Sequence, residues 1–418
     1  MREGDVGGGL TTPRPPRAQR ANKDLLGIPR NVPGSLRRAA ADRAQRAAPA
    51  PPGGHKFHTR AMLLMRAQLT WLWEWLRNLF KPTRPLPPLP TGDNGIYPLS
   101  DGPCLVGLAG DWGSGTADAY AVGDALGRLR PDVTIHLGDV YYAGRSDEFA
   151  DFFLPQNCWP RGVRGTYVLN GNHEMYSGGE GYFDRALQEY RQPTSYFCLQ
   201  NQWWRIVALD TGYHCSKDGD LLLIALHLKH DSTKLPAACV AWLAQTVFAD
   251  PNDRRPVILL THHQPFSAFK KENVYPQLVP PLAPFLDRVA IWFWGHEHRL
   301  ALYARHQNIR GRCIGHGGIP IELPFPDSDP SVPLVLHDAR PGQPIDGEQI
   351  GLNGFVTLGL DGSNLRVRYY DQLSKDGDDF LLEEQWTQKD TVVAGTGVRL
   401  GPRGGKMTAT RALQELIR

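Results

Sequence analysis

The chain has 418 residues, enough for one large domain with extensions or for two modest domains. Apolar residues make up 41% and charged residues 21%, as in an ordinary globular protein. The net charge is +3, but residues 1–60 hold 12 Lys and Arg against 4 Asp and Glu, which leaves −5 for residues 61–418. A net charge of −5 over residues 61–418 argues against specific nucleic-acid binding, which needs a basic face.

Residues 1–60 are rich in Arg, Ala, Pro and Gly and nearly free of aromatic residues. Such a segment cannot bury enough apolar surface to offset the entropy of ordering, so we predict a disordered basic tail. No signal peptide follows Met1, which favours a cytoplasmic or peripherally membrane-associated protein.

Residues 61–81 have Leu and Met at spacings of three and four, which predicts an amphipathic helix widened by Trp71, Trp73 and Trp75. Three charges within the apolar run argue against a membrane span. The helix either docks on the catalytic domain or lies at a membrane surface, where Trp and basic residues are favoured. A Pro-rich linker follows and reaches residue 99.

From residue 100 onward, five short polar motifs each close an apolar run that reads as a buried strand. The runs are Cys104–Ala109, Val133–Leu137, Thr166–Leu169, Val257–Leu260 and Ala290–Trp294. The motifs that follow them are Gly110-Asp111-Trp112-Gly113, Gly138-Asp139-Val140-Tyr141-Tyr142, Gly171-Asn172-His173-Glu174, Thr261-His262-His263 and Gly295-His296-Glu297-His298.

The remaining elements complete an α/β half followed by a β-rich half. Helices are predicted over Thr116–Leu129, Arg145–Phe153, Gly181–Tyr190 and Lys234–Phe248. Strands are predicted over Ser195–Leu199, Trp203–Leu209, Arg312–Ile314, Phe355–Leu360, Leu365–Tyr370 and Glu383–Gln388. This order suggests two packed sheets with helices outside, in a catalytic domain spanning residues 100–388. We expect residues 317–353 to form a loop near the site and residues 389–418 to form a weakly structured tail.

The motifs supply two Asp, an Asn, a Tyr and several His, all at predicted strand ends. Carboxylate, amide and phenolate oxygens suit hard cations, whereas imidazole suits Zn, Fe and Mn. This is a ligand set for two metals, with Asp139 placed to bridge them. Two ions about 3.5–4 Å apart can hold a phosphoryl group and activate a water.

The ordered motifs GD, GDxxY, GNH(D/E), H and GHxH resemble the calcineurin-like metallophosphoesterase superfamily, and specifically its purple acid phosphatase branch. That branch lacks a His two positions after the first Asp, as at Gly113, and has a tyrosinate where Tyr142 stands. The resemblance implies a four-layer αββα sandwich of two mixed β-sheets.

The resemblance also implies the metal ligands, which for the first ion are Asp111, Tyr142 and His298, with Asp139 shared. The second ion would be bound by Asn172, His296 and a His of the fourth motif. The metals would be Fe together with Fe, Zn or Mn.

The activity implied is hydrolysis of a small phosphorylated substrate, most simply a phosphomonoester, by a metal-activated water. His173 resembles the histidine that contacts the phosphate and protonates the leaving group, and we expect Glu174 to fix its orientation.

The fourth motif leaves two candidate ligands. Its strand register favours His262, with His263 as a neighbouring or substrate contact, whereas the family's His-x-Pro spacing would select His263. His214 and His316 are further candidates for the pocket wall, although either could be an ordinary loop residue.

Two rival functions use the same residues. One is a phosphodiesterase or nuclease, and the other is a binding module that keeps the fold without catalysis. The complete set of expected ligands argues against the binding module. The oligomeric state is left open.

Overall fold

The computed structural model describes residues 82–418, except for residues 156–157, 216–232, 270–273, 326, 345–348 and 390–391. The predicted tail over 1–60 and the predicted helix over 61–81 therefore lie outside the described residues. Within the described part of the chain, no helix is both long enough and apolar enough to cross a bilayer.

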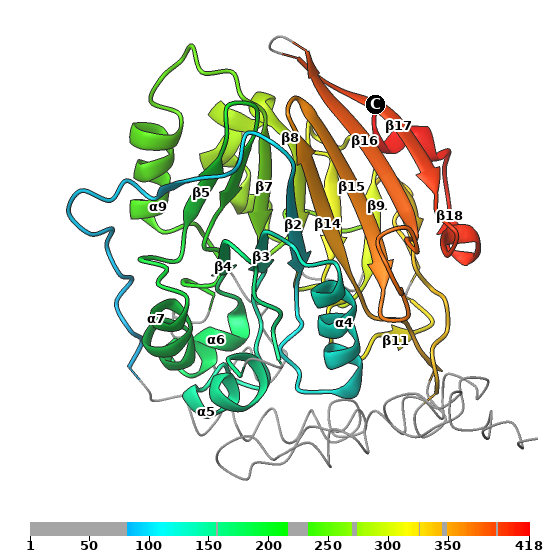
Figure 1. The fold of residues 1–418 in the computed structure, drawn as a ribbon, viewed down its shortest axis with the longest axis horizontal. Helices are drawn as coiled ribbons and strands as arrows, with labels where there is room; N and C mark the ends of the chain where they lie inside the picture. The colour runs from blue at the N-terminus through cyan, green and yellow to red at the C-terminus, as the bar shows by residue number, and fades with distance from the viewer. Residues whose placement is uncertain are drawn as a thin grey trace, which may run out of the picture. The chain divides into compact units, whose positions relative to one another are not determined.

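Two large mixed sheets form the centre of the domain (Figure 1). In the described residues, the first sheet has seven strands in the order β17-β16-β15-β14-β2-β3-β4. Its strands are β2 (Cys104–Ala109), β3 (Val133–His136), β4 (Gly165–Val168), β14 (Gly354–Asp361), β15 (Asn364–Asp371), β16 (Leu382–Lys389) and β17 (Val392–Leu400).

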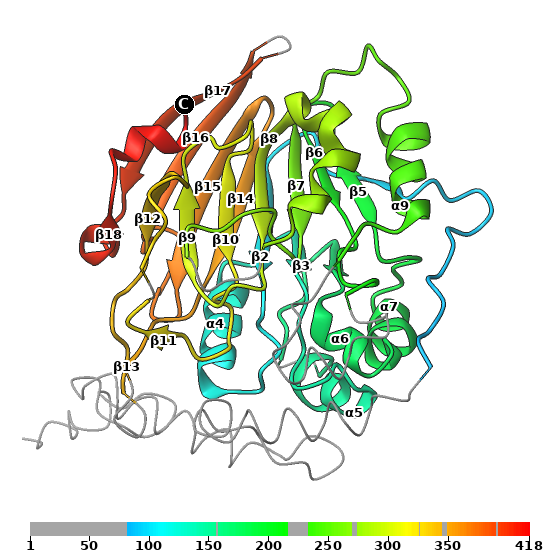
Figure 2. The ribbon, with the colours of Figure 1, turned by 180° about the vertical axis from the view of Figure 1, so that it is seen from behind.

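The second sheet has nine strands within the described residues, in the order β1-β5-β6-β7-β8-β10-β9-β12-β18 (Figure 2). Its strands are β1 (Ile96–Pro98), β5 (Phe197–Gln200), β6 (Arg205–Ala208), β7 (Val257–Thr261), β8 (Val289–Trp294), β9 (Leu300–Tyr303), β10 (Gly311–Ile314), β12 (Leu334–His337) and β18 (Thr408–Ala409). A separate pair joins β11 (Glu322–Leu323) to β13 (Gln349–Ile350).

Helices pack on the outer face of each sheet. Those on the first sheet include α4 (Ala117–Arg128), α5 (Ser146–Glu148) with η1 (Phe149–Phe153), α6 (Asn172–Tyr176), η2 (Tyr182–Ala186) and α7 (Leu187–Glu189). Those on the second include α9 (Ala237–Trp242), η3 (Leu243–Val247), η4 (Pro276–Leu278) and η5 (Pro280–Arg288). The short helices η6 (Gly404–Lys406) and η7 (Leu413–Leu416) lie near the C-terminus. The arrangement is the expected four-layer αββα sandwich.

Side chains alternate between the two faces of each central strand. The buried apolar residues therefore form three large clusters, one between the sheets and one beneath the helices on each outer face. In β8, Ile291 and Phe293 face the core between the sheets, whereas Trp292 and Trp294 face the helices outside. Because both faces are buried, the strand has no polar positions, which is why it reads as a continuous apolar run. Each such side chain contributes about 1.5–3 kcal/mol when it leaves water.

The C-terminal segment differs from prediction. Residues 389–418 are predicted to form a tail, but β17 pairs with β16 of the first sheet, and β18 pairs with β12 of the second. Residues 392–400 combine strand-forming Val and Thr residues with Ala394, Gly395 and Gly397, and this mixture gives no clear alternation of apolar and polar residues. The expected loop over 317–353 likewise contains β12, which pairs with β9. At the other end, β1 pairs with β5, so the domain begins before residue 100.

Candidate metal centre

The five polar motifs follow the carboxyl ends of β2, β3, β4, β7 and β8. The first three strands are parallel neighbours in one sheet, and the last two are parallel neighbours in the other. Parallel strands end at the same edge of a sheet, where α/β folds place their ligand sites. A hydrogen bond connects the strand ends of the two sheets, because His296 N, after β8, donates to Asp111 Oδ2, after β2, over 2.8 Å.

Three of these residues have a left-handed backbone conformation. The φ angles are 59° at Asp111, 74° at Asp139 and 66° at His296. Non-glycine residues adopt such angles rarely and at a free-energy cost, and they cluster at functional sites. The backbone here places side chains at the site at the expense of stability.

The first group of potential ligand atoms surrounds the hydroxyl of Tyr141. This oxygen lies 3.0 Å from Asp111 Oδ1, 3.4 Å from Asp139 Oδ2 and 3.1 Å from His298 Nε2. His298 Nε2 is itself 3.7 Å from Asp111 Oδ1. Two carboxylates, an imidazole and a phenol thus converge on one point.

The second group surrounds the amide oxygen of Asn172. His262 Nε2 lies 3.1 Å and His296 Nδ1 lies 2.9 Å from Asn172 Oδ1. His262 Nε2 is also 3.3 Å from Asp139 Oδ1. Asp139 therefore directs Oδ1 to the second group and Oδ2 to the first, which is the arrangement of a carboxylate shared by two cations.

Each ligand of the second group has a partner that orients it. The His262 Nδ1–H donates to the carbonyl oxygen of Leu137 over 2.8 Å, which directs Nε2 toward Asn172 and Asp139. The hydroxyl of Tyr275 lies 3.2 Å from His296 Nε2, and Asn172 Nδ2 donates to the hydroxyl of Tyr176. The sequence contained no signal for the two tyrosines, since neither belongs to a motif.

His263 lies beside this group, with its ring centre 4.7 Å from that of His296. Its Nδ1 is 3.0 Å from Thr211 Oγ1, and its buried Nε2 has no hydrogen-bond partner among the described residues. One ligand atom from each of His262, His263 and His296 fits within a span of 4.8 Å. The contacts of His262 with both Asn172 and Asp139 make it the better placed of the two candidates.

The surroundings of His173 correct the role predicted for Glu174. His173 Nδ1 lies 2.6 Å from the carbonyl oxygen of Tyr142, which can only accept, so this nitrogen donates. The Glu174 carboxylate instead accepts from the backbone N–H groups of Val140, Asp139 and Gly171 over 2.7, 3.1 and 2.7 Å. Glu174 thus holds two motif loops together, and its place three residues after Gly171 is the spacing of a helix-capping glutamate.

Both tyrosines of the second motif are buried. The resemblance implies Tyr142 as a ligand, but the hydroxyl that lies against Asp111, Asp139 and His298 belongs to Tyr141. The backbone of Tyr142 contacts Glu148 and His173. The resemblance selects Tyr142 by its place three residues after Asp139, and no pattern in the sequence points to Tyr141.

The two remaining histidine candidates lie on the loops that follow β6 and β10. His214 packs edge-on against Tyr213 in the turn after β6. His316 follows β10 and is buried, with its carbonyl oxygen accepting from Asn353 and Gly354. Neither ring nitrogen of His316 has a hydrogen-bond partner among the described residues.

The electrostatics of the site favour cations. Burial raises the pKa of Asp111 well above its usual value, and the charge of Asp139 adds to this effect. Burial also acts to raise the pKa of Asp139, but His262 and His173 hold it well below the usual range. Burial and Asp139 raise the pKa of Glu174 to about 8. Crowded, buried carboxyl groups with imidazole and amide partners fit divalent or trivalent metal ions.

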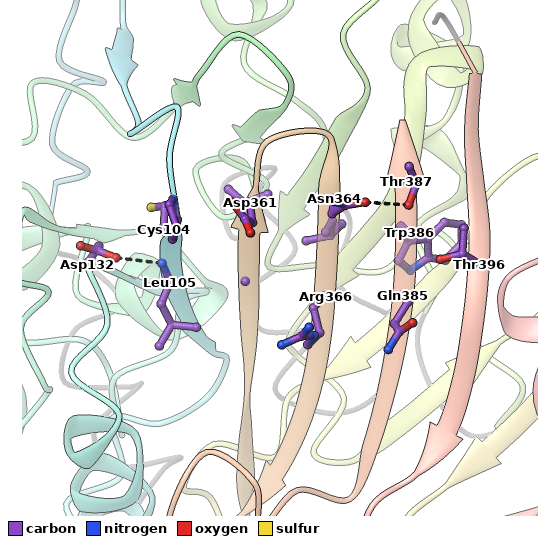
Figure 3. Close-up of a pocket in the computed structure, with 14 residues that line it drawn as sticks. Cys104, Leu105, Asp132, Asp361, Asn364, Arg366, Gln385, Trp386, Thr387 and Thr396 are labelled. Atoms are coloured by element: carbon purple, nitrogen blue, oxygen red, sulfur yellow. Dashed lines mark hydrogen bonds between the residues drawn. The ribbon is translucent and has the colours of Figure 1, made fainter. Parts of the chain in front are cut away.

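A surface pocket of about 470 Å³ lies elsewhere, at the opposite end of β2 from Asp111 (Figure 3). Cys104 and Leu105 line it together with residues of β14, β15 and β16, and Leu105 N donates to Asp132. It contains no histidine, so it does not match the chemistry of the motif cluster.

Comparisons with known proteins agree with the geometry. Residues 105–300 match the family model described as calcineurin-like phosphoesterase. No curated protein matches the sequence.

Three solved structures are among those similar to this chain. PhoD has 10% identity and a TM-score of 0.47, covering 72% of this chain and 73% of its own. A dimetal phosphatase from Danio rerio has 12% identity and a TM-score of 0.41, and the match covers 65% of this chain and 96% of the phosphatase. GAP50, the anchor in the inner membrane complex of Plasmodium, has 10% identity and a TM-score of 0.41. The match covers 72% of this chain and 90% of GAP50. On its family match and its assembled motifs, the chain contains a calcineurin-like phosphoesterase domain.

Proposed function

We propose that this protein is a phosphomonoesterase that works with two metal ions. The observation that supports this most directly is that the two oxygens of the Asp139 carboxylate face different groups of potential ligands. Its Oδ1 faces His262 at 3.3 Å, and its Oδ2 faces the Tyr141 hydroxyl at 3.4 Å. A buried carboxylate between two ligand groups is suited to hold two cations close together.

The first ion would be held by Asp111, His298, Asp139 and a tyrosine of the second motif. The second would be held by Asp139, Asn172, His262 and His296. Iron paired with Fe, Zn or Mn fits this mixture of oxygen and imidazole donors. Ions bound there would supply Lewis-acid chemistry, polarising a phosphoryl oxygen and lowering the pKa of a water.

His173 is the residue placed to protonate the leaving group. Because its Nδ1 donates to the Tyr142 carbonyl, Nε2 is the nitrogen available to a substrate. This Nε2 lies 3.8 Å from Asp139 Oδ2, beside the shared carboxylate. With both ring nitrogens protonated, His173 would deliver the Nε2 proton to the ester oxygen and keep its Nδ1–H bond to the carbonyl, so that the alcohol leaves as a neutral molecule.

The surroundings of Gly113 support a purple acid phosphatase-like branch. Other members of the superfamily are expected to place a metal-binding His at this position. A Cβ on Gly113 would meet Val140 Cγ2 at 2.6 Å and Val140 Cα at 2.8 Å. An imidazole therefore has no room here, and a phenol from the second motif is the available replacement.

The test combines metal analysis with a substrate panel. We expect two metal ions per chain and faster hydrolysis of p-nitrophenyl phosphate than of bis-p-nitrophenyl phosphate or a mononucleotide. Asp139→Asn should lower the metal content and reduce kcat by at least about 100-fold. The matched control is Asp184→Asn, which alters an exposed ion pair with Arg84.

Faster cleavage of the diester would instead support a phosphodiesterase. A protein that binds no metal would contradict both enzymatic functions and support a binding module.

A further inference from the structure

Residues 82–90 are rich in proline and run along the outside of the domain, past α7 and α9 (Figure 1, blue). Five of these nine residues are Pro, which fixes φ and has no N–H. The segment therefore loses little entropy when it becomes ordered, and it has few main-chain donors. Two of these donors, the N–H groups of Arg84 and Leu86, bond to loops beside the candidate metal centre. We call residues 82–87 the strap.

One attachment of the strap is to the loop that follows α6. Arg84 N donates to the carbonyl oxygen of Gly178 over 2.8 Å. The packing is close, because a Cβ on Gly178 would meet the carbonyl oxygen of Pro82 at 2.5 Å. The helix that ends just before this loop has only five residues, and its first two are Asn172 and His173. A helix this short is not stable by itself, so its position depends on what holds its ends.

The strap also contacts the loop after β6. The hydroxyl of Tyr213 accepts from Leu86 N over 3.2 Å and donates to the carbonyl oxygen of Arg84 over 3.3 Å. This loop packs in turn against the residue that precedes α6, because a Cβ on Gly212 would meet the carbonyl oxygen of Gly171 at 2.6 Å. The strap thus supports α6 at both ends, once directly and once through the loop.

The apolar contacts of the segment join the two helix layers. Leu86 packs against both outer apolar clusters, the one beneath the helices of the first sheet and the one beneath those of the second. Leu89 packs against the second of these clusters. Beyond it, the carbonyl oxygen of Asn94 accepts from Trp242 Nε1 over 2.7 Å, and β1 pairs with β5. The segment is therefore anchored on the second sheet and reaches across to α6.

The second group of candidate ligands needs both sheets in register. Asn172 follows a strand of the first sheet, whereas His262 and His296 follow strands of the second. The two imidazole nitrogens lie 3.1 and 2.9 Å from Asn172 Oδ1. A shift of α6 by about 1 Å would change both distances, and a displacement of that size can cost about 100-fold in rate.

We infer that the strap is a positioning element of the site, which holds α6 against the second sheet and through α6 places Asn172 and His173. Its effect on metal binding rests on the proposed two-metal function, whereas its effect on α6 does not. The exposed ion pair between Arg84 and Asp184 adds little to this attachment, because solvent screens it. The main-chain bonds and Leu86 are the contacts that matter.

The experiment compares the full-length wild type with two strap variants. Tyr213→Phe removes both hydroxyl bonds to the strap, and Leu86→Ala removes the side chain that joins the two clusters. The matched controls are Tyr97→Phe, whose hydroxyl bonds to Asp93 on the second-sheet side, and Leu89→Ala. Leu86→Met keeps the apolar volume and should behave like the wild type. Circular dichroism and thermal unfolding establish that each variant is folded.

The first readout is hydrogen exchange of the backbone amides of residues 172–179 in the metal-free protein. We expect exchange to be at least about tenfold faster in both strap variants and unchanged in the controls, because a segment opens locally when its contacts are lost. The second readout is titration with Mn²⁺ and Zn²⁺. One of the two ions should bind about 10–100-fold more weakly while the other keeps its affinity. A general loss of stability would instead speed exchange throughout the domain and weaken both ions.

Wild-type exchange rates at residues 172–179 in both strap variants would overturn the inference, as would equal acceleration in the controls. Faster exchange with unchanged affinity for both ions would also overturn it, since α6 would then move without affecting the site. If the wild type binds no metal ion, the proposed function fails, whereas the exchange rates still decide whether the strap holds α6. If Leu86→Ala does not fold, Tyr213→Phe and its control decide the question.

Discussion

Arg312 of β10 and Glu384 of β16 form a bidentate ion pair that joins the two sheets across their shared core. The two nitrogen–oxygen distances are 2.8 and 2.7 Å, and both side chains are fully buried. The Tyr369 hydroxyl also donates to Glu384, over 2.6 Å. A buried charge that loses its partner is costly, so this pair makes a strong prediction about stability.

Arg312→Ala should lower the free energy of unfolding by about 3–5 kcal/mol, because Glu384 is left charged and unpaired. Urea unfolding followed by Trp fluorescence measures the change. The double variant Arg312→Met, Glu384→Gln should recover much of the loss, since Gln retains an acceptor for Tyr369. Arg84→Ala, at an exposed pair with Asp184, should cost no more than about 1 kcal/mol. A loss below that size for Arg312→Ala would show that the charge is solvated.

His173→Asn should reduce kcat by about 10²–10⁴-fold on an alkyl phosphate, because the leaving alcohol then departs without a proton. The reduction should be much smaller on p-nitrophenyl phosphate, whose leaving group is stable as an anion. Steady-state kinetics on the two substrates give the comparison, with His306→Asn as the control. Equal losses on both substrates would assign His173 to binding rather than to proton transfer.

Glu174→Gln should weaken metal binding by about 10–100-fold, the effect typical of groups that hold ligand-bearing loops. A Gln offers one acceptor oxygen where the carboxylate accepts from three backbone N–H groups. Titration of the metal-free protein gives the affinity, and excess metal should restore most activity. Glu189→Gln, at an exposed ion pair with Arg161, is the matched control. Unchanged affinity with lost activity would point to a direct catalytic role.

Gly171→Ala should disrupt the shared carboxylate. The backbone of Gly171 has φ −103° and ψ −173°, which any residue can adopt, so the variant introduces no backbone strain. Its Cβ would overlap Asp139 Oδ1, and displacing this group by about 1 Å can cost about 100-fold in rate. Gly102→Ala is the control, because its Cβ would meet its nearest neighbour at 3.8 Å. Full activity in Gly171→Ala would mean that Asp139 has another productive position.

Asp253 predicts a dependence of stability on pH. Burial opposes its ionisation, but hydrogen bonds from Arg255 and the charge of Arg205 lower its pKa to about 2. Because the folded pKa lies below the unfolded value of about 3.9, this contribution is present above about pH 4 and is lost as the pH falls through 2.

Asp253→Asn should therefore destabilise the protein by about 1–2 kcal/mol at pH 7, with solvent screening included, and much less at pH 2. Denaturant unfolding of both proteins at the two pH values measures this. A difference that is constant with pH would show that the effect of Asp253 comes from packing.

The strand ends of the site were predictable because each strand is buried on both faces. A continuous apolar run that ends in a polar residue marks the edge of the sheet, and this placed Asp111, Asp139 and Asn172 correctly at one edge. The helix over 117–128 was also readable, since Thr116 caps it by accepting from Ala119 N over 3.1 Å. Local patterns of this kind are visible without tertiary structure.

Other features depend on contacts between distant residues. The strand over 392–400 shows no clear alternation of apolar and polar residues, and it is recognised by its pairing with β16. The orientation of His173 depends on a main-chain carbonyl, which every residue has and no motif can mark. Whether Tyr141 or Tyr142 faces the cluster depends on the path of one loop, for which alternation provides no rule.

The pairing of β14 with β2 has a consequence for how the molecule is made. Val356 lies beside Leu108 in the first sheet, so the strand that presents Asp111 gains its second neighbour only after nearly the whole chain has left the ribosome. Pairings this remote along the chain form slowly, because loop closure must precede the contact. Metal uptake should accordingly follow release of the completed polypeptide, and nascent chains that stop short of residue 361 should remain unable to retain metal ions.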